Sequence, residues 1–303
     1  MFLTGFADEA SKDFQEQIRV TKRLGWNAIE LRNINGKNFG TLTDAEFEIV
    51  CQQIEENGIQ ISCFGSNVAS WGKDPLSDAD FESSRKELLT VIPRMQKLKI
   101  PIIRAMSFKT RMEDERPDSP EIEENVFRKV SELVRICADA GIVYGHENCM
   151  NYGGLSWKHT LRLIEKINHS NFRLIFDTGN PVFNYSWMGN PPYSLQSSWE
   201  FYRNVREFIS YVHIKDGTAM PTDNYRVRPP CEYCFAGDGL GDVRAIVSDL
   251  RKTGYDGGFS MEPHLIHVHH DPNDGSGAPD PVESYIEYGK RFEQLLRDCG
   301  WQF

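Results

Sequence analysis

The chain has 303 residues, of which 40% are hydrophobic and 26% are charged, an ordinary composition for a folded protein. Its formal net charge is −10, spread along the sequence, and no run of Lys and Arg interrupts it. A nucleic-acid backbone is therefore disfavoured as a partner. No apolar stretch approaches the roughly 20 residues of a membrane span, so we expect no membrane partner either.

The N-terminal segment MFLTG has neither the basic region nor the long apolar run of a secretory signal. Seven cysteines, an odd number, are scattered along the chain. This usage is typical of a reducing compartment rather than of a disulfide-bonded scaffold. We therefore expect a cytoplasmic protein.

Short apolar runs alternate with longer segments of helical period from one end of the chain to the other. The expected strands are residues 2–7, 28–31, 59–64, 100–105, 142–146, 172–176, 209–214 and 258–261. The expected helices include residues 44–57, 79–97, 121–140, 158–167, 199–206, 243–252 and 282–296. Glycines that would end helices in the left-handed conformation precede four of these strands, at Gly25, Gly58, Gly141 and Gly254.

This repetition favours a closed parallel (β/α)₈ TIM barrel, with residues 1–303 as a single domain. The alternative is a doubly wound sheet, but the segment GDGLG at 237–241 is one residue short of the phosphate-binding fingerprint. We interpret it as a turn and expect Asp242 to cap the next helix. The longest irregular stretches, 108–120, 181–196, 217–241 and 264–281, each follow a strand, at the end where barrel enzymes build their sites.

Each of the last four expected strands ends in a residue able to bind a metal ion: Glu147 in HEN, Asp177 in FDTGN, His213 in VHIKD and Glu262 in MEP. Neighbouring parallel strands lie about 4.8 Å apart, so side chains at equivalent ends can converge. Three carboxylates and one imidazole suit one divalent ion, Mn²⁺, Co²⁺, Mg²⁺ or Zn²⁺. One such residue alone is more typical of a helix cap or a solvated loop.

Lys215 shares a strand face with His213, so we expect it at the barrel mouth. There it would bind a substrate oxygen or polarise a carbonyl, or else pair with a neighbouring carboxylate. Arg104 lies in an apolar run, where burial without a partner is costly, so it pairs with Glu147 or Glu30 or reaches a substrate anion. The other candidate substrate contacts near strand ends are Glu30, Arg32, Ser66, Trp71, Asn180 and His264.

These motifs, with the closing segment GDGLGDVRAIVSDLRKTGYDGGFSMEP, resemble the xylose isomerase-like superfamily of sugar phosphate isomerases and epimerases over nearly the whole chain. The resemblance implies that Glu147, Asp177, His213 and Glu262 bind one metal ion. It also implies that Glu147 and Glu262 move protons beside a substrate carbonyl, through an enediolate that the metal stabilises. The implied reaction is isomerisation or epimerisation of a small sugar, sugar phosphate or keto-polyol.

The ketose 3-epimerases of this superfamily carry three further polar residues, a His, an Arg and a Glu, where this chain has Asn180, Ala219 and Gly153. The sequence therefore leaves the reaction open. An inosose dehydratase-like lyase and an inactive sugar-binding barrel are alternatives. The DNA-repair branch, with three zinc ions, is disfavoured by the negative charge and by only eight His.

Two clusters remain. Cys231 and Cys234 form a CxxC without a second thiol pair, so we expect two loop thiols rather than a zinc site. The histidines between His264 and His270 lack the spacing of a helical metal site, so we expect no second metal there. A small carbohydrate is the expected partner, and a homo-oligomer is possible.

Overall fold

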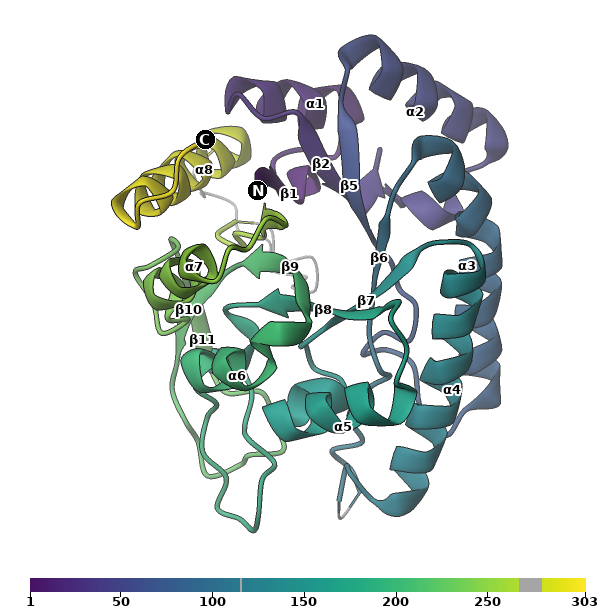
Figure 1. The fold of residues 1–303 in the computed structure, drawn as a ribbon, viewed down its shortest axis with the longest axis vertical. Coiled ribbons are helices and arrows are strands. Elements are labelled where there is room, and N and C mark those ends of the chain that lie inside the picture. Colours follow the sequence, from purple (N-terminus) through teal and green to yellow (C-terminus); the bar gives the residue numbers. More distant parts are fainter. Residues whose placement is uncertain (115, 267–279) are drawn as a thin grey trace.

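The computed structural model describes residues 1–114, 116–266 and 280–303. Eight parallel strands form one sheet in the order β1-β12-β9-β8-β7-β6-β5-β2, and its two end strands, β1 and β2, pack side by side. The sheet therefore curls into a nearly closed barrel (Figure 1), which confirms the predicted fold. The strands are β1 (Phe2–Gly5), β2 (Ala28–Leu31), β5 (Gln60–Gly65), β6 (Ile102–Ala105), β7 (Val143–Glu147), β8 (Phe172–Asp177), β9 (Ile209–Ile214) and β12 (Gly258–Met261).

Helices surround this barrel on its outside (Figure 1). They are α1 (Phe14–Arg23), α2 (Asp44–Asn57), α3 (Asp78–Leu98), α4 (Pro120–Asp139), α5 (Trp157–Ile167), α6 (Ser198–Val205), α7 (Val243–Lys252) and α8 (Pro281–Asp298). Short 3₁₀ turns lie at Ala7–Glu9, Phe39–Thr41, Tyr152–Leu155, Asn180–Phe183 and Arg206–Phe208. Helix α1 is not among the helices expected from the sequence; Asp13 caps it by accepting from the Glu16 amide. No helix of the described part of the chain is long and apolar enough to cross a membrane.

Two short hairpins extend from strand ends. β3 (Asn33–Ile34) pairs with β4 (Lys37–Asn38), and β10 (Asp216–Ala219) pairs with β11 (Cys231–Cys234). The second hairpin lies in the stretch 217–241 that we expected to be irregular, so Cys231 and Cys234 are strand residues with free thiols. The expectation was wrong because neither short segment carries the apolar alternation of a strand.

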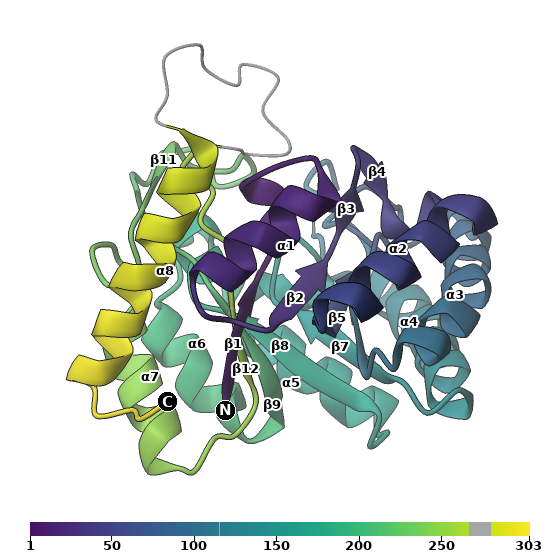
Figure 2. The same ribbon diagram turned by 90° about the horizontal axis from the view of Figure 1, so that it is seen from above.

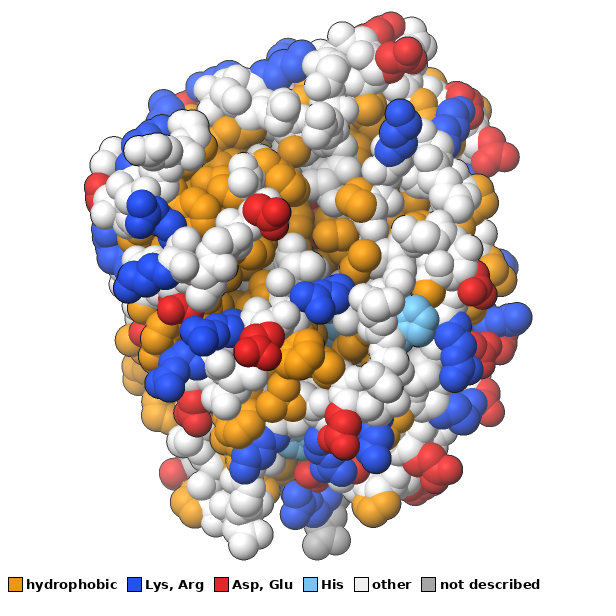
Figure 3. Space-filling model, viewed as in Figure 1, with side chains coloured by type: hydrophobic (Ala, Val, Ile, Leu, Met, Phe, Trp, Pro, Cys, Tyr) orange, Lys and Arg blue, Asp and Glu red, His pale blue; other side chains and the backbone are white. Residues whose placement is uncertain are grey.

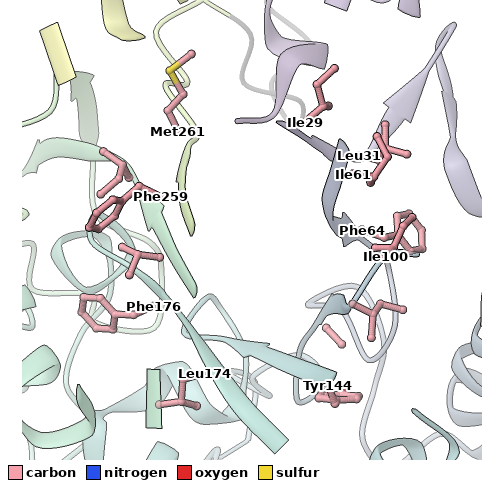
Figure 4. Packing of buried hydrophobic residues seen from close by; sticks show 14 of the residues in the cluster. Ile29, Leu31, Ile61, Phe64, Ile100, Tyr144, Leu174, Phe176, Phe259 and Met261 are labelled. Atoms are coloured by element: carbon pink, nitrogen blue, oxygen red, sulfur yellow. The ribbon is translucent and has the colours of Figure 1, made fainter. Parts of the chain in front are cut away.

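The main core lies between the sheet and the helices. Alternate strand residues point outward, and Figure 4 shows Phe64, Tyr144, Leu174, Phe176 and Phe259 on the outer side of their strands. Inside the barrel, a separate small cluster joins Cys63, Ile175 and Tyr211. The Tyr211 hydroxyl also bonds to the Ser62 hydroxyl, at 2.9 Å, so the interior is filled below the mouth.

All eight strands run toward one end of the barrel. Figure 2 shows the two chain termini at the opposite end and the β3–β4 and β11 segments at the end where the strands finish. Figure 3 views the molecule from the end where strands begin, and hydrophobic side chains gather there among charged ones. Residues that follow the strands therefore collect on the face turned away from that view.

We predict that Phe259→Ala destabilises the barrel by about 3–5 kcal/mol, the usual cost of removing a buried phenyl ring. Phe259 is fully buried, and its ring centroid lies 5.9 Å from that of Phe292 and 5.5 Å from that of Trp301. Chemical denaturation measures the change. The control, Phe303→Ala, removes a ring that is 53% exposed, and its cost should stay below about 1 kcal/mol. Equal losses in the two variants would contradict the packing argument.

Candidate metal centre

Four side chains from successive strands of the sheet converge at the barrel mouth. Glu147 ends β7, Asp177 ends β8, His213 lies in β9 and Glu262 follows β12. One ligand atom from each lies within 4.8 Å of the others, and all four side chains are buried. The register explains the convergence, because Asp177 pairs with His213, and His213 with Ser260, two residues before Glu262 on the same strand face.

The His213 imidazole is held in the orientation of a metal ligand. Its Nε2 lies 3.1 Å from Oε2 of Glu30. Its Nδ1 lies 3.6 Å from Oε1 of Glu147, beyond hydrogen-bond distance, and has no hydrogen-bond partner among the residues that the structure describes. In a metal complex, a carboxylate on the remote nitrogen would fix the tautomer whose other nitrogen binds the ion, as in many metal-bound histidines.

The concentration of negative charge in the cluster also favours a bound cation. Burial alone lowers the pKa of His213, but the carboxylates of Glu30 and Glu147 raise it to about 10. Burial raises the pKa of Asp177, and the neighbouring Glu262 and Glu147 add to this effect. A divalent ion would neutralise this repulsion. The donor set and the partnerless Nδ1 therefore fit one hard or borderline divalent ion.

Asp177 is fixed on two sides. Its Oδ1 accepts from the amides of Gly179 and Asn180, at 2.8 and 2.7 Å. The Asn148 side chain binds both backbone polar groups of Asp177, at 2.7 and 3.0 Å. The carboxylate thus has a defined direction before any ligand arrives.

Lys215 lies between two of the carboxylates. Its Nζ is 2.9 Å from Oδ2 of Asp177 and 2.7 Å from Oε2 of Glu262. Of the alternatives left open for this residue, the pairing with carboxylates is observed, and Lys215 also lines the cavity. It can therefore both compensate charge and meet a ligand.

Arg104 and Asn180 both contact Glu147. Nε of Arg104 lies 3.4 Å from Oε2, and Nδ2 of Asn180 donates to Oε1 at 3.0 Å. The pairing of Arg104 with Glu147 was one of the two alternatives for that residue. These contacts leave the Glu147 carboxylate at the cavity wall with a fixed orientation.

Arg32 anchors a second acidic group. Its guanidinium contacts Asp8 at 3.0 Å, Glu9 at 3.3 Å and Glu262 at 2.9 Å. His264 contacts Glu9 at 3.0 Å, and Glu9, Glu262 and His264 are close enough together to bind an ion. The Arg32 guanidinium already supplies the positive charge there, which argues against a second metal. His267, His269 and His270 of the predicted cluster lie outside the described residues.

The cavity beside the cluster measures about 260 Å³. Its lining includes most of the expected contacts: Arg32, Trp71, Arg104, Glu147, Asn180, Lys215, Glu262 and His264. Trp71 lies at the rim, 40% exposed. Glu30 and Ser66 do not belong to this lining. Glu30 lies behind His213, and the buried Ser66 hydroxyl donates to the Arg104 carbonyl at 2.7 Å.

Sequence reasoning missed several residues that shape the site. Asp8 and Glu9 follow β1, where an acidic pair at a strand end was a usable signal. Asp216, the next residue after Lys215, is fully buried, and its carboxylate accepts from the amides of Gly217, Gly237, Gly239 and Gly241. These bonds fix the loop that follows β9, and they give the GDGLG segment its role.

The structure changes the expectation for Asp242 and gives a local reason for the glycine at position 153. Asp242 occupies the N-cap position of α7 with φ 53°, but its side chain makes no cap hydrogen bond and accepts from the Trp199 amide instead. Gly153 lies behind β7, where an added Cβ would come within 2.3 Å of the His146 ring. A side chain at position 153 therefore has no room in this structure.

Comparisons with known proteins agree with this architecture. A family profile described as xylose isomerase-like TIM barrel matches residues 18–287. A curated relative, an uncharacterized protein from Methanocaldococcus jannaschii, is 27% identical over 170 residues, 55% of this chain and 50% of that protein. The chain thus spans about half the length of that relative.

Solved structures match over nearly the whole chain. A xylose isomerase-like TIM barrel protein from Mycobacterium smegmatis in complex with magnesium has a TM-score of 0.68 and 18% identity, covering 98% of this chain and 97% of that one. The 3-keto-D-glucoside 4-epimerase of E. coli has a TM-score of 0.66 and 18% identity, covering 99% and 100%. Other structural neighbours are sugar epimerases and a probable dehydratase. At these identities the likeness shows the fold alone.

We predict that the protein binds one equivalent of Mn²⁺, Co²⁺, Mg²⁺ or Zn²⁺, and that Asp177→Ala or His213→Ala abolishes this binding. An ion at about 100 times its Kd should stabilise the fold by about 2.7 kcal/mol. Native mass spectrometry gives the stoichiometry, and thermal melts with added metal give the stabilisation. Asp139→Asn, an exposed carboxylate at the end of α4, should leave both unchanged. Full metal binding by either cluster variant would refute the assignment.

Proposed function

Because this chain belongs to the xylose isomerase-like TIM barrel family, we propose that it is a divalent-metal-dependent isomerase or epimerase of a small sugar, sugar phosphate or keto-polyol. The observation that carries the proposal is the buried cluster of three carboxylates and one imidazole at the ends of β7, β8, β9 and β12. Two members of the cluster, Glu147 and Glu262, line a cavity of about 260 Å³.

Glu147, Asp177, His213 and Glu262 would hold the ion. When bound, a divalent cation polarises a substrate carbonyl and stabilises the negative charge that develops on its oxygen. The remaining chemistry belongs to the side chains, which must remove a proton from carbon and return one.

Glu147 and Glu262 are the proposed acid and base. They come from β7 and from the end of β12, which β8 and β9 separate in the sheet, so they would flank a substrate from two sides. Each carboxylate is held by cations, Glu147 by Arg104 and Glu262 by Lys215 and Arg32. This geometry supports proton removal on one side of the substrate and proton delivery on the other.

Lys215, Asn180, Arg104 and His264 are the proposed polar contacts of the substrate, because all four line the cavity. The Lys215 ammonium would donate to a substrate oxygen once a metal ion has taken over part of its role between Asp177 and Glu262. Trp71, exposed at the rim, would supply an apolar wall. A neutral or singly anionic sugar suits such a lining of mixed charge.

A dehydratase reaction is the second candidate. Removal of a proton beside a carbonyl is also the first step in the loss of a β-hydroxyl, so the same carboxylates would serve. The structural neighbours include a probable dehydratase from Bacillus anthracis. A sugar-binding barrel without catalysis is less well supported, because the proposed acid, the proposed base and the proposed metal ligands lie together at the barrel mouth.

We predict that the metal-loaded protein exchanges a carbon-bound proton of a ketose or keto-polyol with D₂O, read by NMR. Glu147→Gln or Glu262→Gln should lower the exchange rate about 10²–10⁴-fold, the usual contribution of a positioned acid or base. Metal content must be measured in parallel, because both residues are also proposed ligands. The same spectra distinguish epimer formation from loss of water.

The matched control for this experiment is Glu232→Gln, which changes an exposed glutamate of β11 near the mouth. Its exchange rate should equal that of the unaltered protein. Retention of full exchange in a metal-loaded Glu147→Gln or Glu262→Gln protein would refute the assigned role of that residue. Absence of exchange with every ketose, sugar phosphate and inosose tested would refute the proposed function.

A further inference from the structure

A second cavity adjoins the one beside the metal cluster. It measures about 150 Å³ and shares Cys149, Met150, Phe183, Asn184 and Arg228 with its neighbour. We propose that the two cavities together bind one glycoside, a sugar that carries a second ring. The reacting ring would lie beside the metal cluster and the second ring in the adjoining cavity. This inference rests on the proposed function and narrows its substrate class.

The lining of the adjoining cavity is aromatic. It includes Phe183, Tyr185, Trp187 and Tyr225. The C–H faces of a pyranose or furanose ring are apolar and pack against aromatic rings, whereas the hydroxyl edges need polar groups such as those of Thr110 and Asn184 in the same lining. Such a mixture matches a sugar ring better than it matches a purely apolar group.

This aromatic wall is held in place before any ligand binds. The Trp187 centroid lies 5.5 Å from that of Tyr225, and Tyr193 packs against both, at 4.5 and 5.0 Å. Arg226 lies over Trp187 and donates to the carbonyls of Met112 and Asp114. A wall that is already ordered costs little conformational entropy when a ligand binds.

Arg228 lies at the junction of the two cavities. Its Nη2 donates to the Tyr233 hydroxyl at 2.7 Å, and its guanidinium lies 5.2 Å from the Phe183 centroid. Its Nε is buried without a hydrogen-bond partner, and no carboxylate forms an ion pair with it among residues 1–114, 116–266 and 280–303. Arg32 and Arg104, by contrast, contact carboxylates. Arg228 therefore retains donors where the oxygens that link two rings would lie.

The sizes agree with a two-ring ligand. The cavity beside the metal cluster, at about 260 Å³, falls below the usual range of roughly 300–1,000 Å³ for small-molecule sites, whereas the two together fall within it. The lining of the second cavity contains two cations, Arg226 and Arg228. Arg226 already donates to two carbonyls, so the Arg228 guanidinium would have to compensate a phosphate there, which makes a neutral ring the better fit.

Calorimetric titration of the metal-loaded protein tests the proposal. The probes are maltose and sucrose with two rings, glucose and fructose with one, and glucose 6-phosphate as a one-ring anion. We expect a two-ring sugar to bind at least about tenfold more tightly than either monosaccharide. Equal affinities, or tighter binding of glucose 6-phosphate, would overturn the proposal.

Thr110→Phe should remove the two-ring preference, because Thr110 lines the adjoining cavity and not the one beside the metal. Affinity for the monosaccharides should persist. Val227→Trp, at an exposed residue of the same lining, serves if Thr110→Phe does not fold. The matched control is Thr90→Phe on the exposed face of α3. A two-ring preference that survives both cavity variants would overturn the assignment of the second ring to this cavity.

The outcomes separate this inference from the proposed function. Proton exchange with monosaccharide ketoses, combined with no two-ring preference, overturns the inference alone. A two-ring preference without exchange from any sugar overturns the catalytic function and leaves a glycoside-binding barrel.

Discussion

The mutual repulsion of buried carboxylates at the barrel mouth is the constraint on which the rest of the site depends. Glu147, Asp177 and Glu262 are buried close together around His213, and the buried Glu30 contacts the same imidazole. Carboxylates so placed cannot all remain charged unless cations compensate them. The surrounding residues differ in how they compensate the charge of these carboxylates.

Lysine and arginine side chains compensate part of this negative charge. Lys215 bridges Asp177 and Glu262, and Arg104 meets Glu147. Arg32 compensates Glu262 together with Asp8 and Glu9. The region around His213 is different, because there the carboxylates of Glu30 and Glu147 face an imidazole rather than a lysine or arginine. This unequal distribution of fixed cations supports the proposed metal position between Glu147, Asp177, His213 and Glu262 and argues against one beside Arg32.

The convergence of the ligands could be predicted from sequence because it depends on two regular periods. Strand alternation puts Lys215 on the same face as His213. Parallel strands end at one edge of the sheet, so four apolar runs that each end in a possible metal ligand predict that these side chains lie together. The residues that pair across long separations could not be predicted in this way. Arg32 meets Glu262 from the far end of the chain, and β10 pairs with β11 across an eleven-residue connection that has no apolar pattern.

Glycines mark a second limit of sequence reasoning. Gly153 was counted as a missing polar companion, yet the structure shows that the His146 ring fills the space a side chain would need. The His146 ring in turn hydrogen-bonds to the Ser107 hydroxyl, and that hydroxyl accepts from the Gly153 amide. The glycine at position 153 is therefore part of a closely packed local arrangement. Restoring a glutamate there would disrupt this network before it reached a substrate.

Substrate choice in this chain must therefore come from elsewhere. The proposed metal ligands and the proposed acid and base lie at or just after strand ends, whose positions the barrel fixes. The aromatic residues around Trp187 and the cation Arg228 stand on the long connections after β8 and β9. Asp216 ties the second connection to the barrel through four backbone amides. Because loops vary more easily than strands, this division would let the proposed strand-end chemistry persist while the loops set which sugar reaches it.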